Sequence, residues 1–439
     1  MVAFGQGCRG ADPQHPVRAA RADGRRSIRG VGARTRCEKR SAGNGSLMRT
    51  GPVALGYLDR TTAELVASAG RVAQLTHWED DNVHACALWC LAIRHAIMTG
   101  VLDMRTTLDV YVRTLTDTRS LSEERSTPRS LSEERSDETK RPTPGPSSEA
   151  EPAETNRRWS ALIDEALTPG AHPRDFNKAN GWVVRAFQGA LAAVAGSQSL
   201  PDAVQRAVRG GNDTDTVAAI AGSLAGAVYG GTAVPLSWKR VLHGWPGIDA
   251  NELTRLAYLA ARHGEPDAAG WPLAERAAVS PASDVLVRHP HDDGVWIGSI
   301  AALDRLPDEV DAVVSLCRVG TAQVPAWCES VQVWLVDQPD RNIDVDFVLS
   351  ETVDAVSALR AQGKTVFVHC FEARSRTAAV AATLRRPPLR RCSGPGVGGC
   401  SRRSPRVRTA GVPARGRQED RCRMSAHRRG CTCHGMMCP

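Results

Sequence analysis

The chain is poor in aromatic residues, because Phe, Tyr and Trp make up 5% of its 439 residues. Its cores must therefore be built mainly from Ala, Val and Leu. No stretch approaches the roughly 18 consecutive apolar residues that a membrane span needs, which argues against a membrane partner. The Arg-rich N-terminus also lacks the apolar segment of a secretory signal. The sequence thus predicts a cytoplasmic protein.

A disulfide framework is missing as well. Of the 13 cysteines, six follow residue 391, and the central region 41–384 holds only Cys86, Cys90, Cys317, Cys328 and Cys370. Few and widely spaced cysteines in the central region are typical of a reducing compartment.

Positive charge is concentrated at the two ends of the chain. Residues 1–40 carry ten Lys/Arg against three Asp/Glu, and residues 385–439 carry fourteen against two. Together these excesses of +7 and +12 are larger than the net charge of +8, which leaves −11 for residues 41–384. A phosphate-binding face normally lies on a folded domain. An acidic central region therefore argues against nucleic acid as a partner.

Shifts in composition divide the chain into four parts. Residues 1–40 lack apolar periodicity and predict a disordered basic segment, and residues 385–439 predict a disordered Arg/Cys-rich tail. Apolar residues at helical spacing predict an all-α domain over 41–264. An insert at about 117–155 interrupts it, where the sequence RSLSEERS occurs twice before a Pro/Ser/Glu-rich run. The fold class is therefore multidomain.

A change from helical to strand-like periodicity marks a further domain at 283–384. Buried strands are predicted over 310–316, 331–336 and 365–368, with an amphipathic helix over 345–362 between the last two. A strand, a helix and a strand that ends in a loop form an α/β arrangement, with the loop at the carboxyl end of a parallel strand.

The loop after the last strand carries a cysteine and an arginine at a chemically useful spacing. Cys370 is followed by five residues and then Arg376, at the predicted start of a helix. Backbone N–H groups of such a loop and the helix dipole attract a phosphate and favour a thiolate. Arg376 can hold two phosphoryl oxygens while Cys370 attacks phosphorus. The alternative is a buried structural cysteine followed by an unrelated arginine.

This segment resembles the signature of the protein tyrosine and dual-specificity phosphatase superfamily, over about residues 283–384. The resemblance implies a cysteine-dependent phosphatase-like domain that acts on a phosphorylated substrate. By position, Asp337 would be its general acid, with Asp340 as the second candidate. Thr377 would help the thiolate to leave. The third loop residue, commonly Gly in that family, is Ala373 here.

A second cluster of polar residues precedes an Ala/Gly-rich helix. In Gly210-Gly-Asn-Asp-Thr-Asp-Thr216, two carboxylates and a hydroxyl lie on a flexible turn. Such hard oxygen atoms suit Mg²⁺ or Mn²⁺. An ordinary helix N-cap made by Asp213 or Thr214 explains the motif equally well.

This motif, together with Gly43–Pro52 and Thr76-His77, resembles the ADP-ribosylglycohydrolase (dinitrogenase-reductase-activating glycohydrolase) family. The resemblance implies an all-helical fold, a dinuclear Mg²⁺ or Mn²⁺ centre and cleavage of a glycosidic bond to ADP-ribose. Asp213, Asp215 and Thr216 would be metal ligands. The substrate-binding residues would be Asn44, Gly45, Ser46, Met48 and His77. The family's upstream Thr-Asp-Asp segment has no counterpart in residues 1–40, so the resemblance implies an N-terminally incomplete domain with half of the ligand set.

Two functional hypotheses follow. The first is a hydrolase that removes ADP-ribose from an ADP-ribosylated protein or small molecule and also carries the phosphatase-like domain. The second is a catalytically inactive, truncated remnant that at most binds ADP-ribose or phosphate. A nucleic-acid binder with a basic tail ranks last.

Overall fold

The computed structural model describes residues 42–126, 152–277, 282–338 and 342–384. The two predicted disordered segments, 1–40 and 385–439, lie outside these ranges. Within them, no helix is both long enough and apolar enough to cross a membrane.

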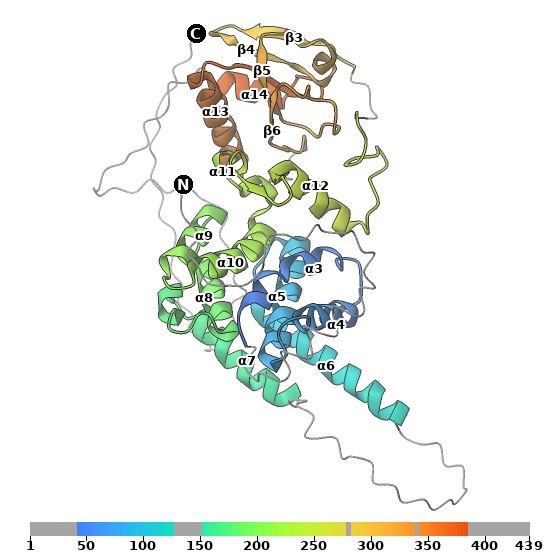
Figure 1. Ribbon diagram of the computed structural model, residues 1–439, viewed down its shortest axis with the longest axis vertical. Helices are drawn as coiled ribbons and strands as arrows, with labels where there is room; N and C mark the ends of the chain where they lie inside the picture. The colour runs from blue at the N-terminus through green and yellow to red at the C-terminus, as the bar shows by residue number, and fades with distance from the viewer. Residues whose placement is uncertain (1–41, 127–151, 278–281, 339–341, 385–439) are drawn as a thin grey trace, which may run out of the picture. The chain divides into compact units, whose positions relative to one another are not determined.

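The first part of the described chain is helical, as predicted (Figure 1). Its helices are α2 (Gly45–Met48), α3 (Gly51–Leu55), α4 (Thr62–Ala73), α5 (Asp80–Thr99), α6 (Met104–Ser126), α7 (Pro152–Ala166), the 3-10 helix η1 (Pro173–Phe176), α8 (Val183–Ala195), α9 (Leu200–Arg209) and α10 (Thr214–Tyr229). Local sequence fixes several of their ends. A capping box between Thr61 and Glu64 begins α4. Gly100, in the left-handed region, ends α5.

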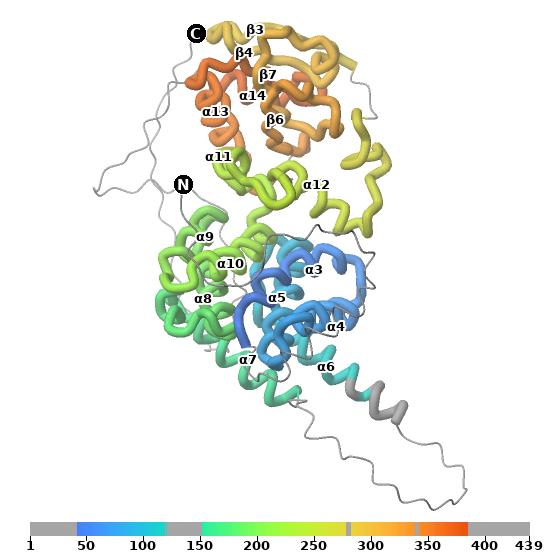
Figure 2. Tube along the Cα trace, viewed as in Figure 1, coloured from blue at the N-terminus to red at the C-terminus, as the bar shows by residue number. Residues whose placement is uncertain are grey.

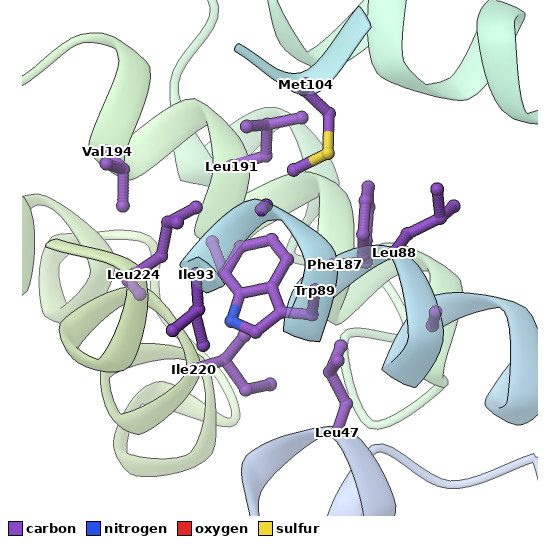
Figure 3. Close-up of a cluster of buried hydrophobic side chains, with 14 of the residues drawn as sticks. Leu47, Leu88, Trp89, Ile93, Met104, Phe187, Leu191, Val194, Ile220 and Leu224 are labelled. Atoms are coloured by element: carbon purple, nitrogen blue, oxygen red, sulfur yellow. The ribbon is translucent and has the colours of Figure 1, made fainter. Parts of the chain in front are cut away.

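Aromatic side chains from three helices form the centre of the helical core. The rings of Trp89 and Trp159 each contact Phe187 edge to face, with centroids 5.1 Å apart. Figure 3 shows Trp89 among aliphatic side chains that include Ile93 and Ile220. Because α8 and α10 are rich in Ala and Gly, they can approach α5 and α9 closely. A few large rings among many small residues are thus enough to fill this core.

The predicted insert is shorter than the sequence suggested. Helix α6 continues to Ser126 and α7 already begins at Pro152, so both enter the range 117–155 that was expected to form a loop. The two helices lie side by side (Figure 2). The first copy of the repeat, RSLSEERS, belongs to α6, because its leucine and glutamates are compatible with a helix that has already begun. The second copy lies outside the described residues.

Short elements connect the helical part to the sheet. They are the 3-10 helix η2 (Gly231–Ala233), helix α11 (Leu236–Lys239), the two-stranded hairpin of β1 (His243–Gly244) and β2 (Ile248–Asp249), and helix α12 (Ala250–Ala261). A capping box between Asp249 and Glu252 begins α12. The chain then runs without regular structure through residues 264–277.

The second part is a five-stranded mixed sheet, which confirms the predicted α/β character. Its strands lie in the order β3-β4-β7-β5-β6, where only β3 is antiparallel to its neighbour. Their bounds are β3 (Leu286–His289), β4 (Asp292–Ser299), β5 (Val310–Ser315), β6 (Glu329–Gln332) and β7 (Thr365–Cys370). A 3-10 helix, η3 (Ile300–Arg305), follows β4, and helices α13 (Val345–Ala361) and α14 (Arg376–Leu384) flank β7 in sequence.

One strand differs from the prediction. The run 331–336 was expected to be extended, whereas β6 ends at Gln332. Trp334 takes a positive φ of 64°, which is incompatible with a strand and turns the chain. Apolar residues beyond this turn, such as Leu335, remain buried without belonging to the sheet.

Candidate functional site

Asn44 joins two segments of the helical part that are far apart in sequence. It precedes α2, and only 8% of its surface is exposed. Its side-chain Nδ2 donates to the backbone oxygen of Asn180 at 2.8 Å and to Oδ2 of Asp213 at 2.7 Å. Its backbone N–H donates to the oxygen of Gly181 at 2.9 Å. The structure therefore brings the predicted substrate-binding segment into contact with the predicted metal-binding segment.

The turn that presents Asp213 is held by asparagines. Gly211 and Asn212 both have positive φ, at 88° and 59°. The side chain of Asn180 bonds both sides of this turn, because its Nδ2 donates to the Gly211 oxygen at 3.0 Å and its Oδ1 accepts from the Asp213 N–H at 3.2 Å. Sequence reasoning missed Asn180. The signal was a polar stretch, residues 177–180, between two helical segments.

Asp213, Asp215 and Thr216 lie at the start of α10. Asp213 occupies the N-cap position, yet its side chain makes no capping bond and accepts from Asn44 instead. Thr216 is 9% exposed, Asp213 is half-buried and Asp215 is exposed. Of the two caps that the alternative interpretation proposed, by Asp213 or Thr214, the one by the Asp213 side chain is therefore not formed. The helix N-terminus adds positive potential beside these carboxylates.

The remaining residues of the Gly43–Met48 segment have different surroundings. Ser46 is fully buried, and its hydroxyl accepts from Nδ2 of Asn82 at 2.7 Å. The same Nδ2 donates to the Gly43 oxygen at 2.7 Å. Met48 is 45% exposed. Ser46 thus anchors the segment to α5, whereas Met48 is accessible to a ligand.

His77 lies directly against this segment. Its Nδ1 is 2.6 Å from Oγ1 of Thr76, which also accepts from Arg49. A Cβ atom at Gly43 would lie 3.2 Å from Nε2 of His77, and one at Gly45 would lie 3.4 Å from its Cε1. A side chain at Gly43 would therefore crowd the imidazole by a few tenths of an ångström, whereas one at Gly45 would only touch it. Burial, followed by the charge of Arg49, lowers the pKa of His77, so the ring is neutral at pH 7.

Acidic and imidazole groups do not gather into a larger cluster. Across the four described ranges, no group of three or more His, Cys, Asp or Glu side chains is placed to hold a metal ion. The predicted ligands at the start of α10 therefore form a set of two carboxylates and one hydroxyl.

In the sheet, the predicted nucleophile Cys370 ends the central strand β7. It is 1% exposed, and the loop 371–375 leads from it directly into α14. Ala373 adopts a positive φ of 59° in this loop, a conformation that favours glycine. Thr377 is 2% exposed, and its hydroxyl donates to the Gly298 oxygen on β4 at 3.4 Å. The loop therefore makes a left-handed turn at Ala373, although no glycine is present there to favour it.

Arg376 and Asp337 meet beside this loop. Nη1 of Arg376 donates to the backbone oxygens of Leu316 and Leu335, at 3.2 and 2.8 Å. Its Nη2 lies 3.4 Å from Oδ2 of Asp337, whose Oδ1 accepts from the Ser375 hydroxyl at 2.7 Å. Nε of Arg376 is buried and has no hydrogen-bond partner. The loops that follow β5 and β6 thus hold the guanidinium in place.

His369 supports the cysteine loop from within the sheet. It is fully buried, and its Nε2 lies 2.8 Å from the Ser315 hydroxyl on β5. Burial, opposed by a hydrogen bond with the Cys370 backbone, lowers the pKa of His369 to about 4. Burial also raises the pKa of the neighbouring Cys317 thiol to about 12. His369 is therefore neutral and Cys317 stays protonated at pH 7.

Comparisons with known proteins match mainly the part of the chain that contains the helical domain. The sequence model of the family described as ADP-ribosylglycohydrolase matches residues 3–269. The chain is 28% identical over 209 residues to "ADP-ribosylarginine hydrolase Tri1" of Pseudomonas putida, which covers 48% of this chain and 44% of that protein. It is 37% identical over 65 residues to the Serratia proteamaculans protein of the same name, covering 15% and 18%.

The chain thus spans less than half the length of the curated relatives it matches. A solved structure titled "ADP-ribosylglycohydrolase-related protein complex" is 23% identical, with a TM-score of 0.33, over 55% of this chain and 71% of that one. These values are too low to carry an argument about the site.

Proposed function

Since the chain belongs to the ADP-ribosylglycohydrolase family, we propose that its helical part hydrolyses the glycosidic bond that attaches ADP-ribose to a substrate. The observation that carries this proposal is the 2.7 Å hydrogen bond between Asn44 and Asp213. It unites the two motifs that the family resemblance assigns to substrate and to metal. The two motifs are 169 residues apart in sequence, so this hydrogen bond is a tertiary contact that a local cap or turn would not require.

The substrate class we propose is ADP-ribosylated arginine, in a protein or a small molecule. The support comes from the two curated relatives, both of which are named as ADP-ribosylarginine hydrolases.

A divalent cation, Mg²⁺ or Mn²⁺, is part of this proposal. Asp213, Asp215 and Thr216 fit such an ion by their oxygen chemistry, and they amount to one side of a coordination shell. When bound, the ion would orient ribose hydroxyls and polarise water. Asn44 would hold the Asp213 carboxylate in a fixed orientation through Oδ2. The other carboxylate oxygen, Oδ1, would then be left to bind the ion.

The neutral His77 would contribute a hydrogen bond without adding charge. Its Nδ1 is engaged by Thr76, which leaves Nε2 beside the Gly43 backbone. This nitrogen could bond a ribose hydroxyl that approaches the glycine segment. A protonated ring would instead repel the cationic arginine group, so the lowered pKa of His77 suits the substrate.

The test is release of ADP-ribose from an ADP-ribosylated arginine peptide by the full chain. We expect release that requires Mn²⁺ or Mg²⁺ and is lost in Asp213→Asn and in Asp215→Asn. Asp202→Asn, on α9, is the matched control and should retain activity. A soluble, folded protein that binds ADP-ribose but releases none with either metal would establish the alternative, a catalytically inactive remnant.

A second function, phosphoester hydrolysis at Cys370, is favoured by one specific observation. Arg376 is fixed by two backbone oxygens and Asp337, yet its buried Nε lacks an acceptor beside the cysteine loop. A phosphoryl oxygen would supply that acceptor. The Cys370 sulfur would attack phosphorus, Asp337 would protonate the leaving oxygen, and water would then cleave the phosphocysteine to inorganic phosphate.

This second function is tested with a generic aryl phosphate. Hydrolysis should be abolished in Cys370→Ser and retained in Cys328→Ser, which removes another buried thiol, directly before β6. Equal hydrolysis by wild type and Cys370→Ser would contradict the proposal. Retained hydrolysis in both metal-site variants, Asp213→Asn and Asp215→Asn, would show that the two reactions are independent.

A further inference from the structure

A cavity of about 550 Å³ opens next to the cysteine loop. Three of its walls come from the loops that follow the parallel strands β5, β6 and β7, and they contribute Arg318, Trp334 and Arg376. The carboxyl ends of parallel strands are where ligands bind in α/β sheets. The cavity lies in this position, and its volume falls in the range of sites for small organic ligands.

The fourth wall comes from outside the sheet, from residues 267–277. This segment is tied to the loop after β5 by backbone hydrogen bonds, from the Thr321 N–H to the Ala274 oxygen at 3.0 Å and from the Ala322 N–H to the Glu275 oxygen at 3.1 Å. Arg318 pairs with Asp267 at 3.0 Å. The wall is therefore part of the same packed unit as the sheet.

Planar groups of fixed orientation line the cavity. The rings of Trp271 and Trp334 meet edge to face, with centroids 5.0 Å apart. The indole N–H of Trp334 donates to the Gln332 side chain at 3.0 Å. The Arg318 guanidinium lies over the Trp271 ring at 4.5 Å. Arg318 thus covers Trp271, and the partly exposed Trp334 is the ring that can stack on a flat ligand.

Two buried donors of the lining residues have no acceptor. One is Nε of Arg376, and the other is the indole Nε1 of Trp271, a residue that is 5% exposed. An unpaired buried donor costs free energy, and a small side-chain movement that turned it toward the cavity would let a ligand acceptor recover that cost. A phosphate oxygen is a suitable acceptor for Arg376. The indole N–H of Trp271 requires an acceptor atom on the flat ring of the ligand.

We propose that this cavity binds a nucleoside monophosphate, with its phosphate at Arg376 and its base against Trp334 and Trp271. The inference rests on the proposed phosphatase function of the Cys370 loop and names its substrate class. A nucleobase offers both a π-face and ring acceptors, whereas a phenyl ring offers only the face. The volume also exceeds what a phosphate and one six-membered ring would fill.

The experiment is calorimetric titration of the full-length Cys370→Ser protein with adenosine monophosphate, phenyl phosphate and inorganic phosphate. We expect adenosine monophosphate to bind at least ten-fold more tightly than either comparison ligand. Trp334→Ala should weaken nucleotide binding by about ten-fold, the size expected for loss of one stacked base. The same variant should leave the affinity for inorganic phosphate unchanged. Trp245→Ala, at a ring that is 92% exposed, is the matched control and should change nothing.

Trp271 is buried, so Trp271→Phe is the safer variant there. This variant keeps an aromatic ring but removes the N–H. It should weaken the binding of adenosine monophosphate several-fold and leave the binding of phenyl phosphate unchanged. Asn44→Ala should leave nucleotide binding intact, because Asn44 belongs to the helical site. Equal affinities for the three ligands, insensitivity to both Trp variants, or loss of binding in Asn44→Ala would each overturn the inference.

The failures of the two proposals are distinguishable. Hydrolysis of aryl phosphate by wild type without nucleotide binding would overturn only the inference about the cavity. Nucleotide binding that depends on Trp334, in a wild-type protein that hydrolyses no phosphoester, would overturn only the phosphatase proposal.

Discussion

The side-chain amide of Asn44 donates to the carboxylate of Asp213 at 2.7 Å, and thereby links the start of α2 to the start of α10. Asn44 is almost fully buried while Asp213 is half-buried, so the bond is shielded on one side from water. A neutral donor here stabilises the carboxylate without cancelling its charge, which leaves it able to bind a cation.

Replacing this donor by a carboxylate should therefore be destabilising. Asn44→Asp would bring two negative charges together and remove the hydrogen bond, with an expected loss of about 1–3 kcal/mol in the free energy of unfolding. Mn²⁺ should recover part of that loss if Asp213 belongs to a metal site. Urea unfolding with and without Mn²⁺ measures both effects. Asn156→Asp, which adds the same charge on α7, should show neither.

The pH dependence of stability should include a contribution from His369. Its pKa is lowered to about 4 in the folded protein, compared with about 6.5 when unfolded. The unfolded state therefore binds more protons between these values, so stability falls as pH decreases from 6.5 towards 4. The full difference corresponds to about 3 kcal/mol. In urea unfolding at pH 7 and pH 4.5, His369→Asn should lose less stability on acidification than wild type. An identical loss in both proteins would contradict this assignment.

The aromatic centre of the helical core should be sensitive to truncation. Phe187 is fully buried between Trp89 and Trp159, so Phe187→Ala should cost about 3–5 kcal/mol. Thermal and urea unfolding give this value directly. Trp245→Ala, at an exposed position, should change the free energy of unfolding by less than about 0.5 kcal/mol.

Gly320 controls the approach of residues 267–277 to the sheet. A Cβ atom at this position would lie 2.2 Å from the backbone oxygen of Glu275, so the segment would have to move. We expect Gly320→Ala to cost about 1–3 kcal/mol and to weaken binding at the neighbouring cavity. Gly226→Ala in α10 is the matched control, because nothing lies within 4 Å of its added methyl group. Both variants can be compared by melting temperature and by titration with adenosine monophosphate.

The role of Asp337 can be separated from its ion pair with Arg376 through the choice of leaving group. If Asp337 is the general acid, Asp337→Asn should lower kcat by about 10²–10⁴ for an alkyl phosphate, whose leaving group needs a proton. An aryl phosphate with an acidic phenol should be affected far less. Equal losses for both substrates would mean that Asp337 only positions Arg376. Asp340→Asn tests the second candidate in the same assays.

Local sequence patterns predicted much of the fold. The helical spacing of apolar residues predicted the helical part and the helix α13, and the apolar runs 310–316 and 365–368 predicted β5 and β7. These patterns succeed because each reflects a face that must be buried. The prediction failed where short-range patterns are ambiguous. β6 ends early because the positive φ of Trp334 turns the chain, and α6 runs further into the repeat than its composition suggested.

The site was also predictable only in part, because patterns along the chain do not show which distant residues come together. The chemistry of their motifs pointed to Asp213, Cys370 and Arg376, and the family resemblance pointed to Asn44. Sequence reasoning missed Asn180, because an asparagine in a polar loop has no distinctive pattern until its partners are known. The family resemblance implied that Ser46 binds substrate, and only the structure shows that its buried hydroxyl accepts a hydrogen bond from Asn82.

By itself, the sequence determined the residue types, the periodicity of the elements and the spacing within each motif, since these depend on neighbours along the chain. Only the tertiary structure decided that Asn44 contacts Asp213 and that Trp271 and Trp334 line one cavity with Arg376. Such contacts form between residues far apart in the chain, and they depend on how whole helices and strands pack to bury their apolar faces.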